Sequence, residues 1–196
     1  MDVMRIPGQR AGLTRTAVLA AAHALLMEGG IDALTMRALA KRLEVAPNAL
    51  YSHVRSKSDL LDEILDDALA SIKAPPMDVD DPIGGITALM TSTYRTLIAR
   101  PDLVPLYLAR QGARGPNAVR LGEVMDALLA RAGVRGSSVP EARRVLIVHT
   151  IGFAAFATGA SSPLDGDRPI GARQSREHFS HSLQWLLAGI TGGAAG

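Results

Sequence analysis

Hydrophobic residues near the start of the chain recur at the spacing of an α-helix. Val18, Ala22 and Leu26 follow one another every four residues and therefore share one helical face. Thr14 stands before this stripe as the expected N-cap, and the pair Gly29-Gly30 offers the left-handed conformation at which a helix ends. The pattern predicts a first helix between Thr14 and this glycine pair.

Two short helices are expected next. Thr35 is placed to cap a helix that runs to about Leu43, with apolar residues at staple spacing around the cap, as in the first helix. After a connection of about three residues, Pro47 suits the first turn of another helix, in which Leu50 and Val54 share a face. A helix this short is unstable alone, so these two side chains must pack against neighbours and leave a polar face for water or a ligand.

The rest of the chain is also expected to be helical. Ser56 followed by Asp59 resembles a capping box at the start of a fourth helix, whose acids, such as Asp62 and Asp66, are interpreted as a solvated face. Residues 73–82, with two adjacent prolines, are expected to link two domains. A surface loop is expected at 161–172, and further helices are predicted at about 82–99, 101–110, 116–133, 139–160 and 174–190.

Composition and charge narrow the class of protein. The 196 residues are 47% hydrophobic but only 4% aromatic and include no cysteine, which favours helices and excludes disulfides and cysteine-bound zinc. No apolar leader opens the chain and no apolar run reaches membrane-spanning length, so a cytoplasmic protein is expected. Residues 1–57 carry eight Lys or Arg but four Asp or Glu, and this basic excess favours nucleic acid as a partner.

The sequence contains few features that would indicate an enzyme. The chain contains no G-x-S-x-G elbow, no glycine-rich phosphate loop and no cysteine nucleophile. His178 and His181 share a helical face, but an exposed histidine pair explains them more simply than a metal site. Neither a cofactor nor a metal is therefore predicted. A helical adaptor that binds protein and an all-α enzyme stay open as alternatives.

The second and third helices have the dimensions of a helix-turn-helix. The segment LTMRALAKRLEVAPNALYSHVRSKSDLL resembles the DNA-binding signature of the tetracycline-repressor (TetR) family, and the resemblance covers about residues 13–70. It implies an all-α fold, with an N-terminal three-helix helix-turn-helix domain before a larger helical ligand-binding and dimerisation domain. The domains expected are a flexible basic arm (1–12), the DNA-binding domain (13–72), a linker (73–82), the helical domain (83–190) and a disordered tail (191–196).

The resemblance also implies which residues meet DNA. The family usually has glycine in the turn where this chain has Glu44, so a left-handed backbone there would carry some strain. Lys57, at the start of the fourth helix, adds a charge where free N–H groups already favour a phosphate. Arg5 and Arg10 are either a minor-groove arm or a solvated tail. The DNA-contacting residues implied are Thr35, Arg37, Pro47, Asn48, Ala49, Tyr51, Ser52, His53 and Lys57.

For the larger domain, the resemblance implies a homodimer through the last two long helices, with Phe156 in the seam. The alternative is that these helices bury themselves within one monomer. An apolar cavity is expected to be lined by Met90, Tyr94, Leu106, Tyr107, Met125, His149, Phe153 and Trp185, although helical spacing makes core packing the alternative for each. The expected function is a homodimeric transcriptional regulator, most often a repressor in this family, that binds a palindromic operator and is released by a small apolar or amphipathic effector.

Overall fold

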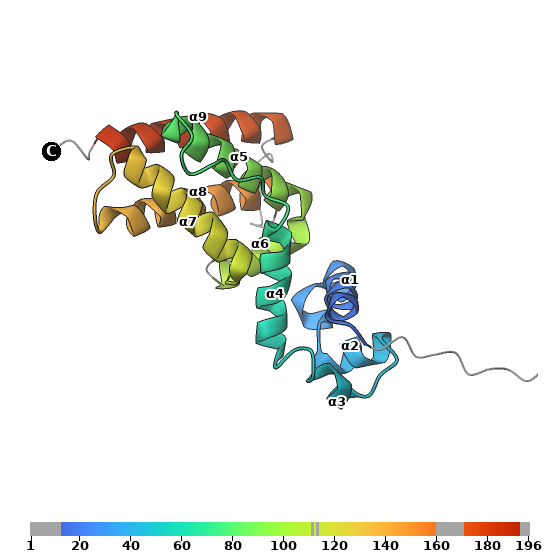
Figure 1. Ribbon diagram of the computed structural model, residues 1–196. Helices are drawn as coiled ribbons and strands as arrows, with labels where there is room; N and C mark the ends of the chain where they lie inside the picture. Colours follow the sequence, from blue (N-terminus) through green and yellow to red (C-terminus); the bar gives the residue numbers. More distant parts are fainter. Residues whose placement is uncertain (1–12, 111, 113, 160–170, 193–196) are drawn as a thin grey trace, which may run out of the picture. The chain divides into compact units, whose positions relative to one another are not determined.

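The computed structural model describes residues 13–110, 112, 114–159 and 171–192 (Figure 1). Within these residues the regular structure is entirely helical, which confirms the expected all-α class. The predicted basic arm, nearly all of the predicted loop at 161–172 and residues 193–196 of the predicted tail lie outside this range. The first two tail residues instead belong to the last helix.

The helices agree closely with the hydrophobic pattern. None of those in the described residues is long and apolar enough to cross a membrane. In chain order they are α1 (Arg15–Ala33), α2 (Met36–Arg42), α3 (Pro47–Leu50), α4 (Lys57–Leu69), α5 (Pro82–Ala99), the 3-10 turn η1 (Pro101–Leu103), α6 (Val104–Arg110), α7 (Pro116–Arg131), α8 (Ser138–Thr158) and α9 (Ala172–Gly192).

Side-chain caps fix where the first helices begin. The hydroxyl oxygen of Thr14 accepts a hydrogen bond from the Ala17 N–H, and that of Thr35 accepts one from the Ala38 N–H. Ser56 accepts from the Asp59 N–H before α4 in the same way. All three caps were predicted, because a hydroxyl that satisfies a free N–H of the first turn is a local property of the sequence.

Internal contacts divide the chain into two units, Met1–Leu60 and Leu61–Gly196, so the boundary falls inside α4. The sequence pattern placed it later, at residues 73–82. Arg131 donates hydrogen bonds to the carbonyl oxygens of Met77 and Val79, which fastens that segment to α7 within the second unit. The segment that follows the adjacent prolines is therefore anchored within the second unit.

The first unit is built around a small aliphatic core. α1 contacts α2, and α2 contacts α3. Gly30, at φ 67°, interrupts α1 near its end, which agrees with the predicted glycine stop. The buried residues come from every helix of the unit: Val18, Ala22, Leu26, Leu34, Leu39, Leu50, Val54 and Leu60.

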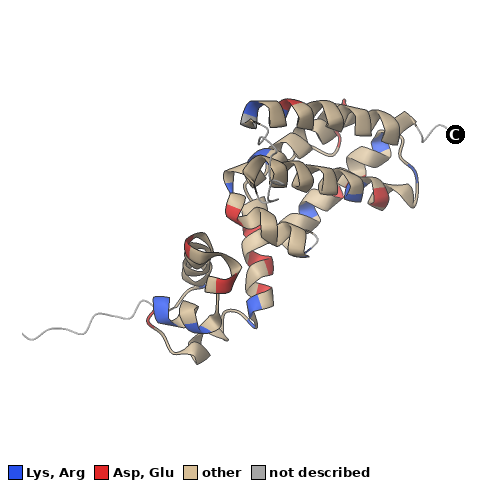
Figure 2. Ribbon diagram, turned by 180° about the vertical axis from the view of Figure 1, so that it is seen from behind, with Lys and Arg blue, Asp and Glu red and all other residues tan. Residues whose placement is uncertain are grey.

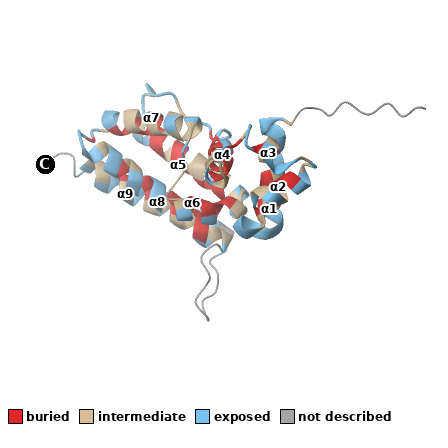
Figure 3. Ribbon diagram, turned by 90° about the horizontal axis from the view of Figure 1, so that it is seen from below, coloured by how far each residue is buried: buried red, intermediate tan, exposed pale blue. Residues whose placement is uncertain are grey.

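The second unit is organised around α5, which packs against α7, α8 and α9. Figure 3 shows buried turns along α5, and α8 and α9 each alternate between buried and exposed positions. Tyr94 and Phe179 are the largest of its fully buried side chains. Leucines from all of these helices complete the core.

The sequence suggested that the acidic residues of α4 form a solvated face, but two of them, Asp62 and Asp66, have protein partners. Asp66 is only 5% exposed, and its carboxylate accepts hydrogen bonds from the backbone N–H groups of Asn117 and Ala118 in the first turn of α7. Asp62 forms a two-pronged pair with Arg110 at 2.6 and 2.7 Å. Sequence spacing assigned these residues to one helix face but not the distant partners that cover it.

Candidate nucleic-acid interface

The short helix α3 presents a polar face to solvent. Leu50 is fully buried and anchors the helix, while Pro47, Asn48 and Ser52 are exposed and the Tyr51 side chain is 54% exposed. The packing of one leucine thus orients the other side chains outward. Such a face can donate and accept hydrogen bonds at base edges or phosphates.

The turn before α3 has a left-handed residue that is not glycine. Glu44 has φ 54°, as expected if the family's glycine position keeps its geometry. The Glu44 N–H donates to the Lys41 carbonyl and the Val45 N–H to the Ala40 carbonyl, which is the Schellman pattern of a helix end. This motif sets the direction of the chain from α2 into α3.

Cations gather beside α3 on the preceding helix. Arg37 and Lys41, together with Thr35 and Pro47, line a hollow of about 520 Å³. Both side chains are exposed, and Figure 2 shows the Lys and Arg segments on α2. Arg37 is among the DNA contacts implied by the family resemblance, whereas Lys41 is not. Its four-residue spacing from Arg37 was the signal that could have found it.

Arg42, the third cation of α2, is already paired. Its guanidinium donates to both carboxylate oxygens of Glu28 at 2.6 and 2.7 Å. These hydrogen bonds lower the pKa of Glu28 from its ordinary value. Arg42 therefore ties α2 to the end of α1.

Two hydroxyl groups of the interface have different hydrogen bonds. The Thr35 oxygen accepts from the Ala38 N–H, so its own O–H stays able to donate to a phosphate. The Ser52 O–H donates to the Ala49 carbonyl at 2.7 Å, so its oxygen is oriented to accept. The pair thus offers one donor and one acceptor to a ligand.

Lys57 has a structural bond that the sequence did not indicate. Its ammonium donates to the Ile31 carbonyl at 2.8 Å, beyond the glycine kink of α1. An ammonium carries three N–H donors, so two stay available for a phosphate. Lys57, Ala49 and His53 are partly exposed, whereas the other six predicted contacts are exposed.

Comparison with known proteins identifies this segment. Residues 18–64 match the family model described as bacterial regulatory proteins, tetR family. The chain is 30% identical over 200 residues to an HTH-type transcriptional regulator of Saccharopolyspora erythraea, covering 91% of this chain and 84% of the relative. The chain belongs to the TetR family of bacterial transcriptional regulators. It is therefore neither an enzyme nor an adaptor, the two alternatives that the sequence left open.

This TetR-family chain is also similar to a named repressor and to a crystal structure that contains operator DNA. It is 29% identical over 137 residues to an HTH-type transcriptional repressor of Mycobacterium tuberculosis, covering 68% of this chain and 52% of the relative. The crystal structure of BioQ with its double-stranded DNA operator has a TM-score of 0.71 and 26% identity, covering 91% of this chain and 98% of that one. The similarity to BioQ thus spans the second unit as well as the helix-turn-helix.

In the second unit of this TetR-family chain, the predicted cavity residues divide into three groups. His149 and Phe153 are half-buried. Trp185 is 74% exposed and does not lie with the others, because the inward positions of α9 are Phe179, Leu183 and Leu187 at four-residue spacing. The remaining five are buried: Met90, Tyr94, Leu106, Tyr107 and Met125.

An aromatic cluster forms where α5, α8 and α9 meet. The rings of Tyr94 and Phe179 stack with centroids 4.3 Å apart. The ring of His149 lies 4.7 Å from that of Phe153 and 5.3 Å from that of Phe179. Phe179 was missed from the sequence, although its place in the buried stripe of α9 was the signal that could have found it.

The aromatic cluster also contains polar atoms. His149 Nε2 lies 2.7 Å from the Ser182 hydroxyl oxygen, whereas its Nδ1 is buried with no hydrogen-bond partner within the described structure. Burial lowers the pKa of His149 below its ordinary value, so the neutral imidazole is favoured. The Tyr94 hydroxyl lies 3.2 Å from that of Ser175. One ring nitrogen is thus left unsatisfied among aromatic side chains.

The last two helices also carry large apolar side chains on the surface. Val148 and Phe156 of α8 are 63% and 70% exposed, close to the 74% of Trp185 on α9. A Cβ added at Gly152 would have no heavy atom within 4 Å. Where such side chains form a contiguous patch, they are typical of an interaction surface.

Proposed function

We propose that this TetR-family regulator is a homodimeric repressor that binds a palindromic operator and is released by a small apolar or amphipathic effector. The observation that supports DNA binding most directly is the exposed polar face of α3 beside Arg37 and Lys41. The relative named as a repressor and the BioQ complex with operator DNA favour the same interpretation. A protein of this kind acts in the cytoplasm, where bacterial operator DNA lies.

In this proposal, α3 enters the major groove. Asn48 recognises adenine because its amide offers a paired donor and acceptor, while Pro47, Ala49 and Ser52 contact neighbouring base edges. The phosphate contacts position the helix and carry no sequence information themselves. They are assigned to Thr35, Arg37, Tyr51, His53 and Lys57, and Lys41 joins them.

The proposed dimer forms through α8 and α9. Its support is the exposed apolar surface formed by Val148, Phe156 and Trp185, which a second copy would bury. Open space at Gly152 allows a partner helix to approach closely. A two-fold dimer places two copies of α3 for successive major grooves, so the operator is expected to be palindromic.

The proposed effector site is the aromatic cluster of Tyr94, His149, Phe153 and Phe179. Its rings offer apolar contact area, and the unsatisfied Nδ1 of His149 offers one polar contact. Trp185, assigned from the sequence to this cavity, is assigned here to the dimer surface. An effector that binds the DNA-free state more tightly shifts the population away from DNA, and operator DNA must weaken effector binding by the same factor.

A gel-shift experiment tests the proposal. Purified protein is mixed with duplexes that tile the DNA upstream of its own gene, with a scrambled duplex of equal length as the control. One duplex containing an inverted repeat should shift at nanomolar protein, and halving the repeat should abolish the shift. Equal binding to every duplex, including the scrambled one, would reject sequence-specific regulation.

A further inference from the structure

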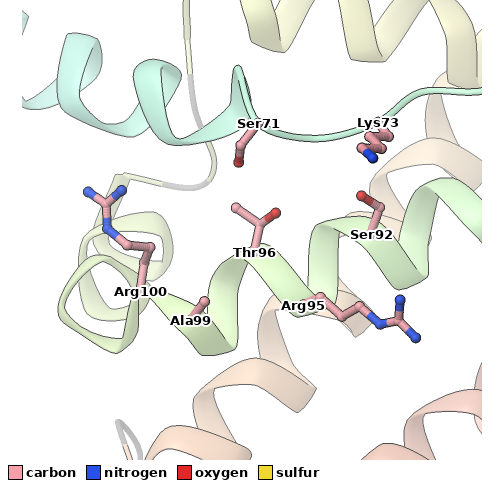
Figure 4. Close-up of a pocket in the computed structure, with 7 residues that line it drawn as sticks. All are labelled: Ser71, Lys73, Ser92, Arg95, Thr96, Ala99 and Arg100. Carbon is pink, nitrogen blue, oxygen red and sulfur yellow. The ribbon is translucent and has the colours of Figure 1, made fainter.

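A second hollow lies in the second unit, between the end of α4 and the helix α5 (Figure 4). Its volume is about 390 Å³, within the range of small-molecule sites. It shares no residue with the aromatic cluster proposed for the apolar effector. The residues that line it are Ser71, Lys73, Ser92, Arg95, Thr96, Ala99 and Arg100.

One wall of the hollow is a polar stripe of α5. Ser92 and Thr96 are four residues apart and point toward the opposite wall (Figure 4). Thr93, on the same helix, donates its hydroxyl to the Leu89 carbonyl. Ser92 and Thr96 make no such bond with any residue in the described ranges, so both hydroxyls are available to a ligand.

The charged residues of the hollow are all cations. Lys73 reaches into it from the segment after α4, facing the α5 stripe, while Arg95 points away from the gap between them (Figure 4). None of the seven lining residues is an acid. The Arg100 Nε is buried and has no hydrogen-bond partner among the described residues. The Arg100 guanidinium adds positive charge at the end of the α5 wall.

We propose that this hollow binds the phosphate group of a small organic phosphate. The donors come from two facing walls: the Lys73 ammonium from one, and the hydroxyls of Ser92 and Thr96 from the other, with Arg100 at the end of the α5 wall. A tetrahedral phosphate, with oxygens in several directions, accepts from both walls at once, whereas a planar carboxylate does so less well. Ala99 leaves an apolar place for the organic part.

Titration calorimetry at low ionic strength tests this proposal. The probes are phenyl phosphate and benzoate, which share a ring and differ in the anion. Lys73→Gln removes the facing charge, and Thr96→Val removes one hydroxyl at nearly constant volume. The matched controls are Arg135→Gln, an exposed cation outside the hollow, and Thr93→Val, whose hydroxyl is already bonded within α5.

We expect the wild-type chain to bind phenyl phosphate more tightly than benzoate. The dissociation constant should rise about tenfold or more in Lys73→Gln and about threefold to fivefold in Thr96→Val. Both control variants should bind as the wild type does. Absence of binding at millimolar phenyl phosphate, benzoate binding of equal strength, or equal affinity in Lys73→Gln and Arg135→Gln would each overturn the proposal. Thermal unfolding of all variants verifies that they are folded.

Discussion

The left-handed Glu44 at the end of α2 makes a quantitative prediction about stability. A non-glycine residue at φ 54° carries a conformational cost of about 1–2 kcal/mol. Glycine removes that cost but adds about 0.5–1 kcal/mol of conformational freedom to the unfolded chain. Glu44→Gly should therefore raise the free energy of unfolding by about 0.5–1 kcal/mol. For a chain of this length the melting temperature should rise by about 1–4 °C.

The same chain contains a matched control for this turn. Gly133, at φ 97°, ends α7 with the same pair of hydrogen bonds, from its own N–H to the Ala130 carbonyl and from Val134 N–H to the Leu129 carbonyl. Gly133→Ala should lower the free energy of unfolding by about 1 kcal/mol, because alanine there acquires the strain that Glu44 has now.

Urea unfolding of the two variants and of Glu44→Gln provides the assay. Glu44→Gln removes the negative charge but keeps a Cβ, so its stability should stay within about 0.5 kcal/mol of the wild type. The reasoning would be refuted if Glu44→Gly were no more stable than Glu44→Gln, since relief of the backbone would then contribute nothing.

Three other predictions concern the second unit. Phe156→Arg should give folded monomers by sedimentation, while Val119→Arg, at another exposed apolar residue, on α7, should stay dimeric. A dimeric Phe156→Arg would contradict the proposed seam. Asp66→Ala should lower the free energy of unfolding, measured by urea denaturation, by about 2–3 kcal/mol, because three hydrogen bonds at the start of α7 are lost. A loss below about 0.5 kcal/mol would contradict this prediction. Folding lowers the pKa of His149, so the unfolded chain binds a proton at this imidazole at a higher pH than the folded chain does. The folded state should therefore be most stable above about pH 6.5 and lose stability as the pH falls below that value. His149→Gln should flatten this dependence, and a pH profile unchanged from the wild type would contradict the reasoning from burial.

The helices and their caps were predictable because the signals are local. An apolar stripe every four residues and a hydroxyl before the first turn lie within a few residues of each other, as at Thr14, Thr35 and Ser56. The left-handed conformation of Glu44 was expected instead from the family resemblance, because glycine usually occupies this turn in the family.

Features that depend on distant partners were not predictable. The burial of Asp66 depends on the start of α7, some fifty residues away in the chain, and the role of Lys57 depends on the Ile31 carbonyl. Trp185 was assigned to the cavity from the sequence, but it is exposed and Phe179 is buried, because only packing against α5 and α8 decides which side chain of α9 faces inward.

The most direct test of the central claim compares operator and random DNA. Fluorescence anisotropy at one salt concentration gives the dissociation constants of both duplexes for the wild type, Asn48→Ala and Arg37→Gln. If α3 reads bases, Asn48→Ala should reduce the ratio of operator to random affinity about tenfold or more while random affinity stays unchanged. Arg37→Gln should weaken both duplexes together and reduce the salt dependence. An unchanged ratio in Asn48→Ala would contradict the account.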